Sequence, residues 1–124
     1  MSRVLIGGFD TIAAIGLRDV LDREGFELVA EEPVASEQRG TESDVRWVLQ
    51  RLVNAAPDVV VLDLDVEYGA ETAELISRNF PAIKVITCSA RTPLMRVYPP
   101  FHDGDYYVSD LSANLLAEAV RSRT

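Results

Sequence analysis

Short apolar runs alternate along the chain with segments whose apolar residues recur at helical spacing. The apolar runs predict strands at residues 3–7, 26–30, 59–64, 83–88 and 106–108. The helical spacing predicts helices at residues 11–24, 45–56, 70–79 and 113–122. Strands that alternate with helices require a parallel sheet with right-handed crossovers and helices on both faces. The pattern therefore predicts an α/β fold built on a five-stranded, doubly wound parallel sheet.

Residues with known roles at helix ends mark several of these boundaries. Asp10 and Thr11 offer N-cap chemistry for the first helix, and Gly25 is placed to end it in a left-handed conformation. Pro57 ends the second helix because proline cannot continue the hydrogen-bond ladder, and Ser112 is the predicted N-cap of the last helix.

Two segments depart from the alternation. Residues 31–44 are polar, acidic and without a period, which predicts a long loop. The stretch from residue 90 to residue 104 contains Pro93, Pro99 and Pro100. Prolines interrupt a helix, so at most a short or distorted fourth helix is expected there, where the alternating fold requires a full one.

Length and charge narrow the class of protein. The 124 residues are enough for one core, so we expect a single domain over residues 1–124. The net charge of −8 opposes binding to nucleic-acid phosphates. No apolar run approaches the roughly 20 residues that cross a bilayer, so no membrane contact is expected and the expected compartment is the cytoplasm. The single cysteine, Cys88, is interpreted as a small buried hydrophobic residue without a functional role.

Ligands of doubly wound sheets bind beyond the carboxyl ends of the strands. The residues at this edge are Gly8, Phe9 and Asp10 after the first strand, Asp63 and Asp65 at the third, Ser89 after the fourth and Ser109 after the fifth. The set is partly acidic, and these are the candidate site residues.

The chain resembles the receiver domain of two-component response regulators, most closely the NarL type. The resemblance spans nearly the whole sequence and is carried by RVLI, GLR, PDVVVLDLD, VITCSA and YYVSDLSANLLAEAVR. PDVVVLDLD, residues 57–65, is the most specific of these motifs. The resemblance implies a flavodoxin-like sheet with strand order 2-1-3-4-5. It also implies a signalling domain rather than an enzyme.

The resemblance assigns roles to three residues. Asp63 stands where the family's aspartate accepts a phosphoryl group from a sensor kinase. Ser89 and Tyr106 match the hydroxyl residue and the aromatic residue that move together when the phosphoryl group binds. The acceptor position and the switch pair are therefore both present.

The positions that neutralise charge in the family have changed. Two carboxylates after the first strand normally bind magnesium, but the matching residues are Gly8 and Phe9, whose side chains cannot ligate a metal. Ser109 replaces the family's lysine. Lys84, the single lysine, begins the fourth strand, and at about 3.3 Å per residue it lies roughly 16 Å toward the wrong edge of the sheet. Phosphoryl transfer needs cations that neutralise the charge of the phosphoryl oxygens. Both usual sources of that positive charge, the magnesium ion and the lysine, are therefore compromised.

A rearranged cluster of Asp10, Asp63 and Asp65 is the set through which Mg²⁺ could still bind.

Each of these site residues also has a purely structural explanation. Asp10 is a good helix N-cap, and Asp63 could be a relic of ancestry bonded to backbone amides or to Ser89. Ser89 and Ser109 could satisfy backbone groups at strand ends, and Tyr106 could simply pack.

Two apolar side chains fall on the solvent side of their helices by angular count. These are Ile15 and Trp47, and aromatic residues such as Trp47 are favoured anchors at interfaces. Trp47 could equally lie beneath the long loop. The expected partner is a protein: a second copy of the chain, a sensor kinase or an output domain.

Three hypotheses remain open at this stage. The first is an atypical receiver that acts through protein contacts without normal magnesium-dependent phosphorylation, and so needs no cofactor. The second is a phosphorylatable receiver of a two-component system with Asp63 as acceptor. The third is a small-molecule sensor that uses the space near Gly8 and Phe9, which rests on analogy with flavodoxin-like folds.

Overall fold

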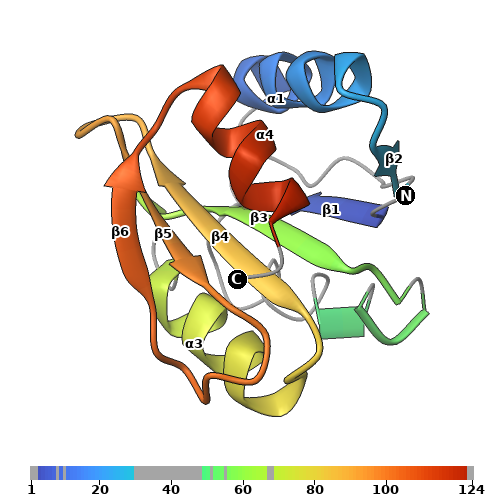
Figure 1. Cartoon of the computed structure of the whole chain (residues 1–124), viewed down its shortest axis with the longest axis vertical. Coiled ribbons are helices and arrows are strands. Elements are labelled where there is room, and N and C mark those ends of the chain that lie inside the picture. The colour runs from blue at the N-terminus through green and yellow to red at the C-terminus, as the bar shows by residue number, and fades with distance from the viewer. Residues whose placement is uncertain are drawn as a thin grey trace.

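One mixed β-sheet forms the centre of the protein, seen here in a computed structural model (Figure 1). The structure describes residues 3–7, 9, 11–29, 49–50, 52–54, 56–66 and 69–122. Within them the sheet has six strands: β1 (Arg3–Gly7), β2 (Glu27–Leu28), β3 (Val59–Asp63), β4 (Lys84–Ser89), β5 (Leu94–Tyr98) and β6 (Tyr107–Asp110). Their order is β2-β1-β3-β4-β5-β6. The first four strands pair in parallel, whereas β5 is antiparallel to both of its neighbours.

Strand β5 corrects the sequence prediction. A five-stranded parallel sheet with a shortened fourth helix was expected, but the segment between β4 and β6 forms a strand instead of a helix. Pro93 and Pro99 flank this strand, outside the ladder in which a proline would remove a hydrogen bond. Within it, Met95 and Val97 are buried in the core, and Val97 and Tyr98 are residue types that favour strands. The α/β class is confirmed, and the sheet is mixed.

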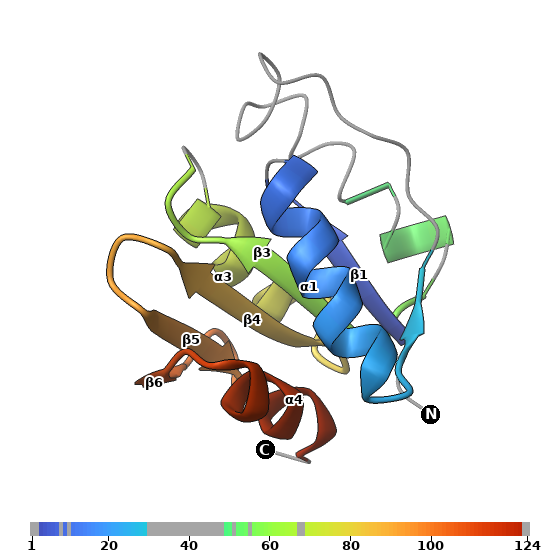
Figure 2. The ribbon, with the colours of Figure 1, turned by 90° about the horizontal axis from the view of Figure 1, so that it is seen from above.

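Among the described residues, the sheet is covered by α1 (Thr11–Arg23), α3 (Gly69–Asn79) and α4 (Ala113–Arg121). Figures 1 and 2 show α1 and α4 side by side on one face and α3 on the other. Residues 49, 50 and 52–54 are also helical, and Ala56 lies outside the helix with a φ of 48°. The other residues of the second predicted helix, 45–48, 51 and 55, lie outside the described residues. No helix in the described ranges is long and apolar enough to span a membrane.

The alternation of side chains along the strands builds a core on each face. Val4 and Ile6 of β1 pack into the core beneath α1 and α4, whereas Leu5 between them packs into the core beneath α3. In β3, Val61 belongs to the first core and Val60 to the second. Both faces of the central strands are therefore covered, which explains why their sequences are continuously apolar.

Two predicted helix ends are confirmed. Gly25 has a φ of 82°, which glycine adopts without steric cost, and its N–H donates to the Asp22 carbonyl at 3.0 Å. Ser112 is the N-cap of α4, and its side chain accepts a hydrogen bond from the Leu115 N–H at 3.2 Å. Asp10, the predicted cap of α1, lies outside the described residues.

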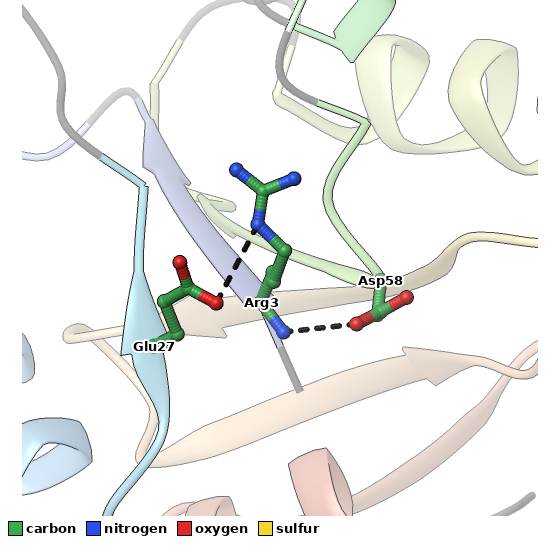
Figure 3. A network of polar contacts seen from close by, with 3 residues as sticks. All are labelled: Arg3, Glu27 and Asp58. Atoms are coloured by element: carbon green, nitrogen blue, oxygen red, sulfur yellow. Dashed lines mark hydrogen bonds and ion pairs between the residues drawn. The ribbon is translucent and has the colours of Figure 1, made fainter. Parts of the chain in front are cut away.

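Charged residues at the amino edge of the sheet hold strands and a helix together. The Arg3 backbone N–H donates to Asp58 Oδ2 at 2.9 Å, and its Nε lies 3.7 Å from Glu27 Oε2 (Figure 3). Lys84 is buried at the start of β4, where its Nζ donates to the carbonyls of Ala119, at 2.7 Å, and Ser122. Burial lowers the pKa of Lys84. The single lysine is thus tied to the carboxyl end of α4, as far from the candidate site as its strand allows.

Candidate functional site

The carboxyl edge of the sheet brings two predicted site residues to adjacent strand ends. Asp63 is the last residue of β3 and Ser89 is the last residue of β4. Asp63 is in register with Cys88, and the Leu64 N–H donates to the Cys88 carbonyl at 2.9 Å just beyond. The parallel pairing therefore places the turns after β3 and β4 side by side.

The carboxylate of Asp65 joins these two turns. Its Oδ1 accepts a hydrogen bond from Ser89 Oγ at 2.8 Å. Its Oδ2 accepts from the Ala90 N–H at 2.8 Å and from the Arg91 N–H at 3.3 Å. Thr92 adds two contacts from its N–H and its Oγ1 to Ser89 Oγ, each at 3.3 Å. The buried Ser89 hydroxyl is therefore engaged from two sides.

The surroundings of Asp65 favour its charged form. Burial acts to raise its pKa, but the hydrogen bonds from Ser89, Ala90 and Arg91, together with the Arg91 charge, outweigh burial and lower the pKa below its ordinary value. Asp65 is accordingly a carboxylate, an acceptor at both oxygens.

Asp63 is half-buried and contributes to the same corner. Its Oδ1 accepts a hydrogen bond from the Asp65 N–H at 2.9 Å, which fixes the backbone that carries the Asp65 side chain. Burial, together with the negative charge of Asp63, raises the pKa of the neighbouring Cys88 thiol to about 12. Cys88 is thus a protonated, buried thiol at neutral pH.

Tyr106 lies away from this corner. Ser89 pairs with Leu94 of β5, and Leu94 pairs with Asp110 of β6. Tyr106 is four residues before Asp110, so it is about 13 Å back along the strand direction and roughly 10 Å across two strand spacings from Ser89. The inserted β5 therefore separates the predicted switch pair, and Ser109 on β6 is likewise two strands from β4.

Tyr106 has its own cluster between β5 and α3. Its ring centroid lies 5.1 Å from that of Tyr98, and the Arg96 guanidinium carbon lies 4.8 Å from the Tyr106 centroid. These side chains line a cavity of about 300 Å³, together with Glu71 and Glu74 of α3. Tyr106 is 47% exposed, so packing accounts for only part of its surface.

The described members of the predicted metal cluster, Asp63 and Asp65, accept hydrogen bonds from groups of the protein. Both oxygens of Asp65 accept hydrogen bonds from the β4–β5 turn, and Asp63 Oδ1 accepts from the backbone. Phe9 is partly buried against the core and has no ligating atom. In the ranges that the structure describes, no group of three or more His, Cys, Asp or Glu could hold a metal ion. Asp10 and Gly8 lie outside those ranges.

Of the two predicted interface residues, the structure describes Ile15. Ile15 is 62% exposed on α1, one turn from the exposed Ile12. Trp47 and the loop at residues 31–44 lie outside the described residues.

Sequence reasoning did not find the role of Asp65. It treats Asp65 as a metal-ligand candidate, because Asp65 follows the acceptor position Asp63 and could join a rearranged cluster with Asp10. The carboxylate instead faces the adjacent turn, and pairing partners 24 to 26 residues apart left no local signal in the sequence.

Comparison with known proteins supports the fold alone. No protein-family model matches the sequence, and no curated protein does. A solved structure described as a response regulator from Thermotoga maritima is similar, with a TM-score of 0.52 and 18% sequence identity. The match covers 98% of this chain and 77% of that chain. This protein therefore has a receiver-like fold, in which β5 takes the place of the helix expected between β4 and β6.

Proposed function

We propose that this chain is an atypical receiver domain of the NarL type, which acts in signal transduction or transcriptional regulation through protein contacts. In this proposal Asp63 is not phosphorylated by the normal magnesium-dependent route. The receiver-like fold supports the signalling class, and the motif PDVVVLDLD supports the family assignment. The surroundings of Asp63 support the loss of phosphorylation.

The observation that carries the proposal is the missing charge neutralisation at Asp63. A transferred phosphoryl group spreads negative charge over its oxygens, and catalysis consists largely of stabilising that charge. Phe9 stands where the resemblance expects a carboxylate for magnesium, and Ser109 stands where it expects a lysine. Lys84 cannot substitute, because its Nζ is bonded to carbonyls of Ala119 and Ser122 at the other edge of the sheet.

The remaining carboxylate near Asp63 does not compensate for these losses. Asp65 adds a second negative charge to the corner, and its oxygens accept hydrogen bonds rather than face outward to a cation. A phosphoryl group on Asp63 would therefore meet like charge in place of Mg²⁺. The geometry therefore supports an Asp63 that occupies the acceptor position but is not phosphorylated by the magnesium-dependent route.

The test is to incubate the protein with Mg²⁺ and acetyl phosphate and measure its intact mass. A receiver with an intact acidic pair, run alongside, shows that the donor is active, and Asp63→Asn is the matched control in this chain. The proposal expects that neither wild type nor Asp63→Asn gains the mass of a phosphoryl group. An adduct present in wild type and absent from Asp63→Asn would overturn it in favour of a phosphorylatable receiver.

Exposed apolar residues on α1 support the part of the proposal that concerns protein contacts. Ile12 is 85% exposed and Ile15 is 62% exposed, and the pair presents an apolar ridge to solvent. If this ridge joins two copies of the chain, sedimentation will report a dimer for wild type and a monomer for Ile15→Lys. A wild-type monomer would exclude self-association and leave a different protein as the partner.

A further inference from the structure

Strand β6 forms one edge of the sheet, and among the described residues it pairs on one side only. It is the last strand in the sheet order, and its described partner is β5 (Figure 1). In an antiparallel pair, successive residues turn their N–H and C=O groups alternately toward the partner strand and away from it. The Leu111 N–H donates to the Pro93 carbonyl at 2.8 Å, which fixes the phase of this alternation. Val108 and Asp110 therefore turn their N–H groups toward the open edge.

Apolar side chains lie exposed along the same edge. Tyr106, Tyr107 and Val108 are between 43% and 55% exposed. Tyr106 contacts Tyr98 and lines the cavity beside α3, and Val108, two residues later, lies on the same face of the sheet. A strand added beyond β6 would therefore have apolar neighbours at alternate positions on this face.

The charges at this edge are negative. Asp103 and Asp105 precede β6, Asp110 is its last residue, and all three side chains are exposed. Within the described part of the chain, none of the three makes an ion pair. A second copy of the chain, with its net charge of −8, would bring the same acidic edge to the contact. A basic segment would bring the opposite charge, so charge complementarity favours a basic partner.

We infer that β6 is a docking edge for an extended basic segment of another protein, which adds to the sheet as a further strand. Main-chain hydrogen bonds to Val108 and Asp110 supply affinity in this mode of recognition, and contacts with alternate side chains supply specificity. Basic residues at the ends of the segment face Asp105 and Asp110. The inference rests on the proposed function only in taking a protein as the partner.

The test titrates ¹⁵N-labelled protein with a blocked seven-residue peptide that has lysine at both ends and alternating threonine and valine between them. The Val108 and Asp110 amide resonances should move along a saturating curve, because their N–H groups gain an acceptor. The same peptide with glutamate at both ends should bind about tenfold more weakly. Replacing Asp105 and Asp110 together by Asn should weaken binding of the lysine peptide about fivefold. The matched control replaces Asp19 and Asp22 of α1 by Asn, which should leave binding unchanged.

Each of three results would exclude this docking edge. The first is a lysine peptide that leaves the Val108 and Asp110 resonances of wild type unmoved, and the second is equal binding of the two peptides. The third is protection of these two amides from hydrogen exchange that rises with protein concentration in the absence of peptide, which would assign the edge to a second copy of the chain.

Failure of this inference is distinguishable from failure of the proposed function. A phosphoryl adduct on Asp63 would contradict the proposed function and leave the peptide titrations unchanged. A failed titration would instead leave the proposed function with the apolar ridge of α1 as its contact surface.

Discussion

Lys84 is a buried charged residue with a structural role. The last carbonyls of a helix have no partner within it, and a cation near them also interacts favourably with the helix dipole. Lys84 Nζ meets both needs by donating to Ala119 and Ser122 at the end of α4. This contact ties the first residue of β4 to the last turn of the chain's final helix.

Lys84→Met should lower the free energy of unfolding by about 1–3 kcal/mol, because it removes the donor to the buried Ala119 carbonyl. Arg78→Met is the matched control, since Arg78 makes an exposed pair with Glu74 one turn away in α3. That variant should lose no more than about 0.5 kcal/mol. Urea denaturation measures both, and equal losses would contradict the role assigned to Lys84.

Cys88 should be inert in the folded protein. Burial and the charge of Asp63 raise its pKa to about 12, so its reactive thiolate is absent at pH 8. Labelling with Ellman's reagent should therefore occur only as the chain unfolds, at a rate that rises with denaturant. Rapid labelling in native buffer would contradict the burial of this thiol.

The same shift fixes how Cys88 affects stability at alkaline pH. An unfolded cysteine ionises near its ordinary pKa of about 8.5, whereas the folded thiol keeps its proton until about pH 12. The unfolded state therefore releases a proton first, and the native state loses stability as pH rises between these values. Cys88→Ala should remove this contribution from the alkaline limb of the stability profile.

At the scale of single residues, the sequence predicts where a site residue lies in the fold better than it predicts that residue's hydrogen-bond partners. Asp63 and Ser89 could be placed at strand ends because a strand's end is marked in its own local pattern. The hydrogen bonds of Asp65 could not be predicted, because they depend on how two turns from different parts of the chain face each other. The separation of Tyr106 from Ser89 depends on the sheet order and was equally hidden.

At the scale of elements, the strand at Leu94–Tyr98 is the instructive error. Pro93 and Pro99 predict breaks in a helix, but they flank a short run that alternates between the two faces of the sheet. A run of five residues has too few turns to separate a period of 2 from a period of 3.6. The expected alternation of strands and helices along the chain then favours a helix at this position. The helices α1, α3 and α4 could be predicted because their apolar residues recur at helical spacing over several turns.

Gly69 fixes the connection from β3 to α3. A Cβ at this position would lie 2.5 Å from the Asp63 carbonyl oxygen and 3.2 Å from that of Leu64. Both contacts are to backbone, which cannot move aside as a flexible side chain does. The glycine therefore lets the start of α3 approach the turn that carries Asp63 and Asp65.

Gly69→Ala should destabilise the protein by about 1–3 kcal/mol, because the added methyl group overpacks this junction. Gly16→Ala is the matched control: its Cβ would meet nothing within 4 Å on α1. That variant should stabilise by roughly 0.5–1 kcal/mol, since alanine is the better helix former. Thermal unfolding distinguishes the opposite signs, and a neutral Gly69→Ala would exclude the close approach.

At the scale of the whole molecule, the inserted strand changes which parts of the sheet can communicate. Ser89 at the carboxyl edge and Tyr106 before β6 are separated by β5 and by most of a strand's length. Tyr106 contacts Tyr98 and Arg96 instead. A change at Ser89 would have to pass through β5 to reach it, so the geometry favours independence of the two residues.

A double-mutant cycle tests this independence. Substitutions more than about 7–10 Å apart that share no partner usually add within about 0.5 kcal/mol. Ser89→Ala and Tyr106→Ala should therefore have additive effects on the free energy of unfolding, whereas Ser89→Ala and Asp65→Ala, which break the same hydrogen bond, should not. Strong coupling between Ser89 and Tyr106 would mean that a switch operates across β5. Additivity would mean that Ser89 and Tyr106, which the sequence resemblance predicts to be a switch pair, act independently in this sheet.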